Sequence, residues 1–143
     1  MRPHDAVPRP EGNGDEVTTS IAVDALLARA RAGLDRVEPA NLAAEVEAGA
    51  VVVDIRPVEQ RTSDGEIPGA VVVNRNVLEW RLDPTSPHRL PLASPELRVV
   101  VVCREGYQSS LAAATLRELG VPRATDLIGG HLAWRDHEAS GPR

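Results

Sequence analysis

One cysteine, Cys103, is the side chain in this sequence whose type and surroundings best suit covalent chemistry. It ends the apolar run at residues 97–103, and a helical pattern of apolar residues begins at residue 111. Ligands of open α/β sheets bind at the carboxyl ends of the strands, so Cys103 stands at the expected reactive position. Loop N–H groups and the start of the following helix would stabilise its thiolate, the nucleophilic form. The alternative is an inert cysteine buried at a strand end.

The remaining residue types indicate no second chemical site. Four scattered histidines, His4, His88, His131 and His137, together with one cysteine do not have the spacing of a zinc site. We therefore expect neither a metal nor a cofactor. All 16 side chains counted as Lys or Arg are arginine, which excludes Schiff-base chemistry on lysine.

The composition predicts one soluble domain of 143 residues. The 21 acidic residues outnumber the 16 basic ones, and aromatic residues make up only 2% of the chain, so nucleic-acid binding is disfavoured. The longest apolar run, residues 99–103, is far shorter than a membrane span, and the first residues do not resemble a signal peptide. We expect a cytoplasmic protein with no nucleic-acid or membrane partner.

Three segments are expected along the chain. Residues 1–18 carry prolines and glycines among charges and bury little apolar surface, which predicts a flexible tail. Residues 19–33 are expected to form an accessory amphipathic helix with Thr19 or Ser20 as its cap, and its apolar stripe needs a surface to pack on. Residues 34–143 form the main domain.

Alternating strand and helix patterns in the main domain predict an α/β fold. Apolar runs at residues 50–55, 70–73 and 97–103 lack polar alternation, as is typical of parallel strands covered on both faces. A possible strand at 34–37 and a weak one at 124–128 join them. Helices are expected from Pro39 to Gly49, from Ser109 or Ser110 as cap to Leu119, and from about residue 130 to 138, whereas residues 83–95 form a loop.

Four segments together resemble the rhodanese family of sulfurtransferases. CREGYQSS (103–110) is similar to that family's active-site loop, in which a cysteine, a glycine at the fourth position and a helix opening with Ser or Thr cradle a persulfide. VVVDIRPVEQ (51–60) resembles the Asp-x-Arg strand end, DGEIPGAVVV (64–73) the His-Ile-Pro-Gly-Ala turn, and LIGGHLAWR (127–135) the Gly-Gly-x-x-x-Trp segment. The segments follow in the family's order. Glu66 is a departure, since the family commonly has histidine there.

The resemblance implies a central, mainly parallel five-stranded sheet flanked by helices, and a two-step reaction. Cys103 would take a sulfane sulfur from a donor such as thiosulfate and pass it, as a persulfide, to a thiol, cyanide or a protein acceptor. The residues agree with this chemistry, because sulfur transfer needs a good nucleophile and leaving group more than an acid, a base or a metal. Main-chain amides would supply the stabilisation.

We expect the loop after Cys103 to bind the substrate through Arg104, Glu105, Gly106, Tyr107, Gln108 and Ser109. Arg104 is either a contact for a dianionic donor or an exposed, solvated side chain. Glu105 would oppose an anion. Gly106 is expected to provide a positive φ or a close approach of its amide. Tyr107 either covers the pocket or faces solvent.

Asp54 and Arg56 are expected to form a structural ion pair near the site.

Two other functions are known for a cysteine loop or a fold of this kind. Cysteine phosphatases carry an arginine six residues after the nucleophile, where this chain has Ser109, which disfavours phosphatase activity. A non-enzymatic sulfur carrier or protein-interaction module of the same fold remains the alternative function.

Overall fold

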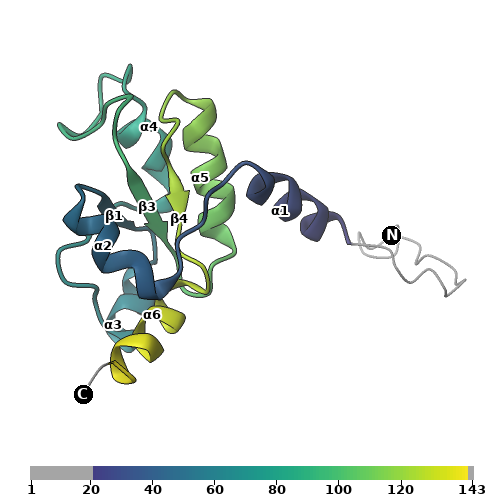
Figure 1. Ribbon diagram of the computed structural model, residues 1–143. Helices are drawn as coiled ribbons and strands as arrows, with labels where there is room; N and C mark the ends of the chain where they lie inside the picture. The colour runs from purple at the N-terminus through teal and green to yellow at the C-terminus, as the bar shows by residue number, and fades with distance from the viewer. Residues whose placement is uncertain (1–20, 142–143) are drawn as a thin grey trace, which may run out of the picture.

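The computed structural model describes residues 21–141, which build a parallel sheet with helices on both faces (Figure 1). The strands are β1 (Val51–Asp54), β2 (Val71–Val72), β3 (Val99–Val102) and β4 (Thr125–Asp126). They pair in the order β2-β1-β3-β4, and each pair is parallel. The expected α/β fold is confirmed, and each strand lies inside a run predicted from the sequence. Within residues 21–141, the expected strand at 34–37 amounts to a single parallel bridge between Val37 and Leu127, beside β4.

Helices precede, link and follow these strands. They are α1 (Ala22–Ala32), the 3-10 turn η3 (Pro39–Asn41), α2 (Leu42–Glu47), α3 (Val58–Asp64), the 3-10 turn η4 (Arg75–Val77), α4 (Leu78–Leu82), α5 (Gln108–Glu118) and α6 (Gly130–Ala139). The segment expected as a loop, 83–95, contains turns and irregular backbone and no helix or strand. No helix within residues 21–141 is both long enough and apolar enough to cross a membrane.

Both faces of the central strand β3 are buried. Val99 and Val101 belong to one apolar cluster with side chains of α4 and α5, whereas Val100 and Val102 belong to a second cluster on the opposite face. The second cluster includes Leu42 of α2, and Trp134 of α6 packs against it. Successive side chains of a strand point to opposite faces, so a strand covered on both sides needs an apolar residue at every position, and in β3 each of these residues is valine.

The first helix, α1, lies outside the helical layers, on the side of α5 away from the sheet (Figure 1). None of its residues is buried. Leu26 and Ala30 of α1 line a shallow groove together with Leu111 and Ala114 of α5, which is the surface that its apolar stripe requires. The expected tail over residues 1–18 and the expected caps at residues 19 and 20 lie outside the described residues.

The start of α5 corrects one sequence prediction. The helix begins at Gln108, with Tyr107 as its N-cap and without a side-chain cap, so Ser109 and Ser110 are not caps. Both serines are buried in the first turn, and their hydroxyls donate hydrogen bonds to Asp126 Oδ2 at 2.7 and 2.8 Å. The buried carboxylate competes for these hydroxyls, which would otherwise be available to cap the helix.

Candidate active site

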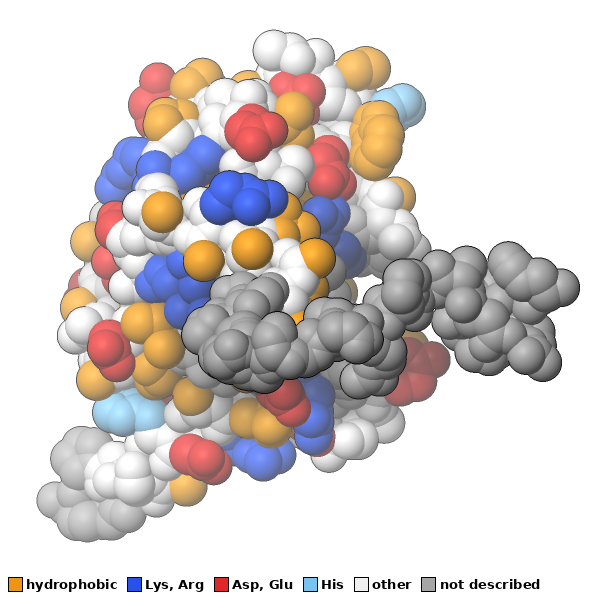
Figure 2. Space-filling model, turned by 90° about the vertical axis from the view of Figure 1, so that its right-hand side faces the viewer, with side chains coloured by type: hydrophobic (Ala, Val, Ile, Leu, Met, Phe, Trp, Pro, Cys, Tyr) orange, Lys and Arg blue, Asp and Glu red, His pale blue; other side chains and the backbone are white. Residues whose placement is uncertain are grey.

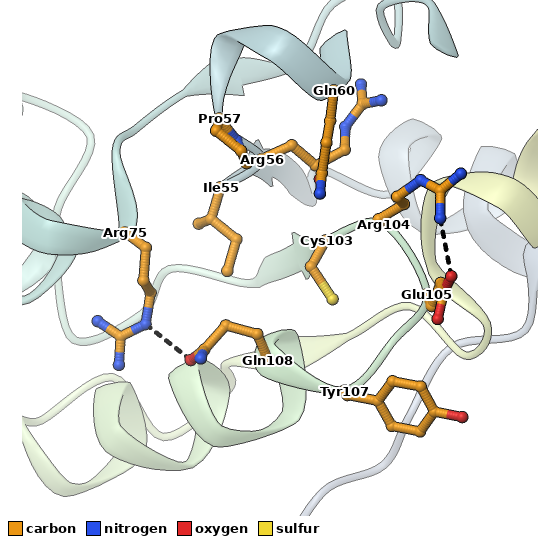
Figure 3. Close-up of a pocket in the computed structure, with 10 residues that line it drawn as sticks. All are labelled: Ile55, Arg56, Pro57, Gln60, Arg75, Cys103, Arg104, Glu105, Tyr107 and Gln108. Carbon is orange, nitrogen blue, oxygen red and sulfur yellow. Dashed lines mark hydrogen bonds and ion pairs between the residues drawn. The ribbon is translucent and has the colours of Figure 1, made fainter. Parts of the chain in front are cut away.

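A pocket of about 490 Å³ opens at the carboxyl ends of β1 and β3 (Figure 3). Its lining residues come from the segments after these two strands and from α3, η4 and the start of α5: Ile55, Arg56, Pro57, Gln60, Arg75, Cys103, Arg104, Glu105, Tyr107 and Gln108. Strand β2 pairs with one edge of β1, whereas β3 pairs with the other edge of β1 and β4 lies beyond β3. The pocket therefore occupies the point where the strand order reverses, which is the usual ligand site of such sheets.

Cys103 lies at the bottom of this pocket with its sulfur held by main-chain N–H groups. The amides of Gly106 and Ser109 donate to Sγ at N···S distances of 3.2 and 3.3 Å. Ser109 lies in the first turn of α5, so the positive end of that helix also points at the sulfur. Cys103 is only 7% exposed, and in such a water-poor setting fixed dipoles stabilise a negative sulfur effectively.

The start of α6 holds the first residues of the loop through their carbonyls. The N–H groups of His131 and Leu132 donate to the carbonyls of Cys103 and Arg104 at 2.8 and 3.1 Å. These carbonyls are thus satisfied on the side of α6. The beginning of the cysteine loop is thereby attached to α6.

Glycines allow the loop and α6 to approach this closely. Gly106 has a φ of +91°, and a Cβ there would lie 2.8 Å from the backbone nitrogen of Gly129. A Cβ on Gly130 would lie 2.6 Å from the carbonyl oxygens of both Cys103 and Arg104. Side chains larger than hydrogen at these positions would separate the two segments.

Arg104 and Glu105 lie at the pocket rim and are bound to each other. Arg104 Nη1 lies 2.8 Å from Glu105 Oε2, and Arg104 Nε donates to Asp64 Oδ2 of α3 at 3.0 Å. The hydrogen bond from Arg104 holds the pKa of Asp64 below its usual value. Two carboxylates therefore share the guanidinium that was considered as a contact for an anionic donor.

Tyr107 and Gln108 occupy the opposite rim. Tyr107 lines the pocket but is 59% exposed, so its ring borders the opening without closing it. Gln108 Oε1 accepts a hydrogen bond from Arg75 Nε at 3.0 Å, as drawn in Figure 3. Arg75 in turn pairs with both carboxylate oxygens of Glu79 at 3.0 and 2.9 Å. Like Arg104, this second pocket arginine is neutralised by a carboxylate.

The Asp54–Arg56 pair lies beneath the pocket. Arg56 Nη2 contacts Asp54 Oδ2 at 2.8 Å, and both side chains are almost completely buried. Arg56 Nη2 also donates to the carbonyl of Gly65 at 2.8 Å, so the pair ties the end of β1 to the segment after α3. These contacts are those of a structural pair, although Arg56 also lines the pocket.

A buried acid behind the loop, Asp126 of β4, was not singled out from the sequence. It accepts hydrogen bonds from Ser109 and Ser110, and it forms a salt bridge with Arg36, whose Nε lies 2.8 Å from Oδ1. Its side chain is fully buried. The sequence feature that could have identified Asp126 is its charge within the weak strand at 124–128. A carboxylate that is buried in a strand needs several hydrogen-bond donors, so polar side chains are expected around it.

Four lining residues were also not predicted: Ile55, Pro57, Gln60 and Arg75. Ile55 and Pro57 directly follow β1, so the rule that ligands bind at strand ends could have identified them. Gln60 and Arg75 lie in α3 and η4, two elements that the sequence pattern did not predict. Among residues 21–141 no group of three His, Cys, Asp or Glu side chains is arranged to hold a metal ion.

Comparison with known proteins identifies the family. The sequence model of the rhodanese-like domain matches residues 38–137, which include both sheet segments of the pocket and the whole cysteine loop. The chain belongs to the rhodanese-like domain family. The match begins after α1, so this rhodanese-like chain carries a helix that precedes the family's domain.

Solved structures share the fold. A protein of unknown function from Rhodopseudomonas palustris, described as a possible tyrosine phosphatase, is 31% identical, with a TM-score of 0.75 over 94% of this chain and 98% of that one. The human single-domain sulfurtransferase TSTD1 is 26% identical, with a TM-score of 0.57 over 71% of this chain and 95% of that one.

A curated relative carries sulfurtransferase in its name. The adenylyltransferase and sulfurtransferase UBA4 of Candida albicans is 31% identical over 86 residues, which are 60% of this rhodanese-like chain and 19% of that protein. The UBA4 protein of Eremothecium gossypii is 30% identical over 101 residues. The chain thus spans about a fifth of the length of the curated relatives that it matches.

Proposed function

We propose that this rhodanese-like chain is a sulfurtransferase in which Cys103 carries the sulfur as a persulfide. The observation that supports this most strongly is the pair of main-chain N–H groups, from Gly106 and Ser109, that donate to Sγ at the bottom of the pocket. Such donors stabilise a negative charge on sulfur without supplying or removing a proton. This is the requirement of sulfane transfer, in which thiolates attack and leave.

In the first step the Cys103 thiolate attacks the outer sulfur of a donor such as thiosulfate. A bond forms between Sγ and that sulfur, the sulfur–sulfur bond of thiosulfate breaks, and sulfite leaves with the electron pair. In the second step cyanide or an acceptor thiolate attacks the terminal sulfur of the persulfide. The bond to Sγ breaks, its electrons return to Cys103 as thiolate, and thiocyanate or a new persulfide departs.

The side chains around the loop are the part of the site that would recognise the donor and the acceptor. Arg104 and Arg75 each contact a carboxylate, and Glu105 adds a negative charge at the rim. A dianion such as thiosulfate therefore meets little free positive charge, and we expect it to saturate the enzyme only weakly. A thiol or protein acceptor would reach Cys103 past the exposed ring of Tyr107. A cytoplasmic location belongs to the same proposal, because a reducing compartment keeps the thiol free.

Phosphatase activity, suggested by the name of the Rhodopseudomonas protein, has less support. The position six residues after Cys103 is Ser109, whose hydroxyl bonds to Asp126, so no guanidinium there would hold a phosphoryl group. The stronger alternative is a sulfur carrier or interaction module that accepts sulfur without turning over small acceptors.

Mass analysis of the protein after incubation with thiosulfate tests the proposal. We expect one added sulfur atom in the wild type, transfer of that atom to cyanide, and loss of both in Cys103→Ser. Ser63→Ala, which removes an exposed hydroxyl outside the pocket, serves as the control and should keep both. Uptake of sulfur without transfer to cyanide or to any thiol favours the carrier. Undiminished turnover in Cys103→Ser refutes the proposal.

A further inference from the structure

The carbonyl of Gly106, at the centre of the cysteine loop, is bound by two arginines from the N-terminal part of the chain. Arg31 Nη2, from α1, donates to this oxygen at 2.7 Å, and Arg36 Nη2 donates to it at 3.1 Å. Arg31 lies 75 residues away in sequence and Arg36 lies 70. Both precede residue 38, where the match to the rhodanese-like domain begins.

Further contacts fix both guanidinium groups in place. Arg36 donates from Nε and Nη2 to the two carboxylate oxygens of Asp126, at 2.8 and 3.2 Å. Arg31 donates from Nε to Ser110 Oγ at 3.0 Å, and its guanidinium carbon lies 5.7 Å from the centre of the Tyr107 ring. A guanidinium group whose N–H groups form several hydrogen bonds has little freedom to rotate away from the carbonyl of Gly106.

The geometry of the Gly106–Tyr107 peptide group relates the contacts of Arg31 and Arg36 to the sulfur site. No peptide bond among residues 21–141 is cis, so the N–H of Tyr107 points opposite to the carbonyl of Gly106. A carbonyl held on the side of the arginines turns this N–H away from them. The N–H groups that donate to Sγ are those of Gly106 and Ser109, which lie on either side of this peptide group in the sequence. Gly106 provides both the carbonyl that the arginines bind and an N–H that donates to Sγ, so fixing the carbonyl restricts the position of that N–H.

We propose that Arg31 and Arg36 are positioning residues of the active site, which hold Gly106 by its carbonyl so that the N–H of the same residue stays in contact with Sγ. The segment before the family's domain thereby forms part of the catalytic apparatus. The inference deepens the proposed function, since both concern the Cys103 thiolate, but it requires no particular donor or acceptor.

Arg31 gives the cleaner test, because Arg36 also neutralises the buried charge of Asp126. The simpler alternative is that Arg31 merely attaches α1 to the body of the protein. Arg29 offers a matched control: it lies on the same helix and is exposed, and within residues 21–141 its side chain makes no hydrogen bond or ion pair. Figure 2, viewed from the side on which α1 lies, shows arginines interspersed with acidic and apolar side chains, so losing one charge changes this face little.

The experiment is alkylation of Cys103 by iodoacetamide, measured against pH in Arg31→Gln, Arg31→Lys and Arg29→Gln. This reaction reports on the thiolate alone, so it remains informative even if the protein transfers no sulfur. We expect the rate at pH 7 to fall about fivefold in Arg31→Gln, the effect of one net hydrogen bond, and to be unchanged in Arg29→Gln. Arg31→Lys should recover the rate only in part, because lysine keeps the charge without the fork.

Three results would overturn the inference. The first is a wild-type rate in Arg31→Gln, and the second is an equal loss in Arg29→Gln. The third is full recovery in Arg31→Lys, which would assign the effect to charge alone. Thermal unfolding of each variant shows whether α1 has detached: a low rate in Arg31→Gln supports the inference when its melting temperature matches that of Arg29→Gln. A low rate that appears only with a lower melting temperature contradicts it.

Discussion

Replacing Gly106 with alanine tests whether close contact between the cysteine loop and α6 holds the sulfur site together. Gly106 has a φ of +91°, and an added Cβ would lie 2.8 Å from the nitrogen of Gly129 and 3.2 Å from that of Gly130. Both neighbours are backbone atoms, which cannot rotate away as a side chain can. Gly120 is a matched control, because it has a φ of +105° and no atom within 4 Å of an added Cβ.

The two variants share one cost and differ in another. A non-glycine residue at positive φ costs about 1–2 kcal/mol, and this applies to Gly106→Ala and Gly120→Ala alike. The contact with α6 adds roughly 1–3 kcal/mol of overpacking in Gly106→Ala alone. For a chain of this size 1 kcal/mol lowers the melting temperature by about 3–4 °C, so Gly106→Ala should melt roughly 3–12 °C below Gly120→Ala.

The same displacement should harm catalysis. We expect a loop that moves to relieve the contact to displace the Gly106 amide, which now donates to Sγ at 3.2 Å. Losing one such donor typically costs about 100-fold or more in turnover. We therefore expect sulfur transfer to cyanide to fall by at least about 100-fold in Gly106→Ala and to stay near the wild-type rate in Gly120→Ala. Equal melting temperatures and equal turnover in the two variants would refute the role assigned to the α6 contact.

Two further predictions concern charge. Burial, and then the positive charge of Arg56, lower the pKa of His131 below 6.5. The unfolded chain therefore binds a proton at this histidine more readily than the folded chain does. As a result, the free energy of unfolding should decrease as pH falls from 7 to 5. Urea denaturation at both pH values should show a smaller decrease in His131→Gln, and an equal decrease in both proteins would contradict this. Glu105→Gln should lower the KM for thiosulfate about two- to fivefold, since it removes a half-exposed negative charge at the rim and leaves Arg104 with one carboxylate partner, Asp64, in place of two. Steady-state kinetics should show no such change in Glu47→Gln, whose carboxylate is exposed at the end of α2, and an unchanged KM in Glu105→Gln would contradict the prediction.

The sequence predicted the elements whose burial is periodic or continuous. The valine runs of β1 and β3 could be recognised because both faces of these strands are covered, so no polar residue interrupts them. Helix α3, with the sequence VEQRTSD, could not be recognised because it buries no residue and carries no apolar stripe. Helix α4 has only five residues, too few to display a helical period.

The same distinction applies to the site. Cys103 and its loop could be identified because strand, loop and helix are contiguous in sequence, and the structure brings all six expected loop residues to the sulfur or to the pocket lining. Arg31, Arg36, Arg75 and Asp126 could not be assigned to the site, because each reaches the loop from a distant segment. Only tertiary packing brings such residues together, and no local pattern encodes it.

The use of main-chain atoms to hold Sγ has a consequence for how this protein can diversify. Under the proposed function, charge stabilisation depends on the backbone of the loop, whereas recognition of the donor and the acceptor would depend on the side chains that the same loop presents to solvent. Arg104, Glu105, Tyr107 and Gln108 can therefore be exchanged without removing a single donor to the sulfur, but Gly106 cannot. New substrates become accessible through substitutions that leave the chemical step intact, so specificity and reactivity can evolve independently within one seven-residue segment, 103–109.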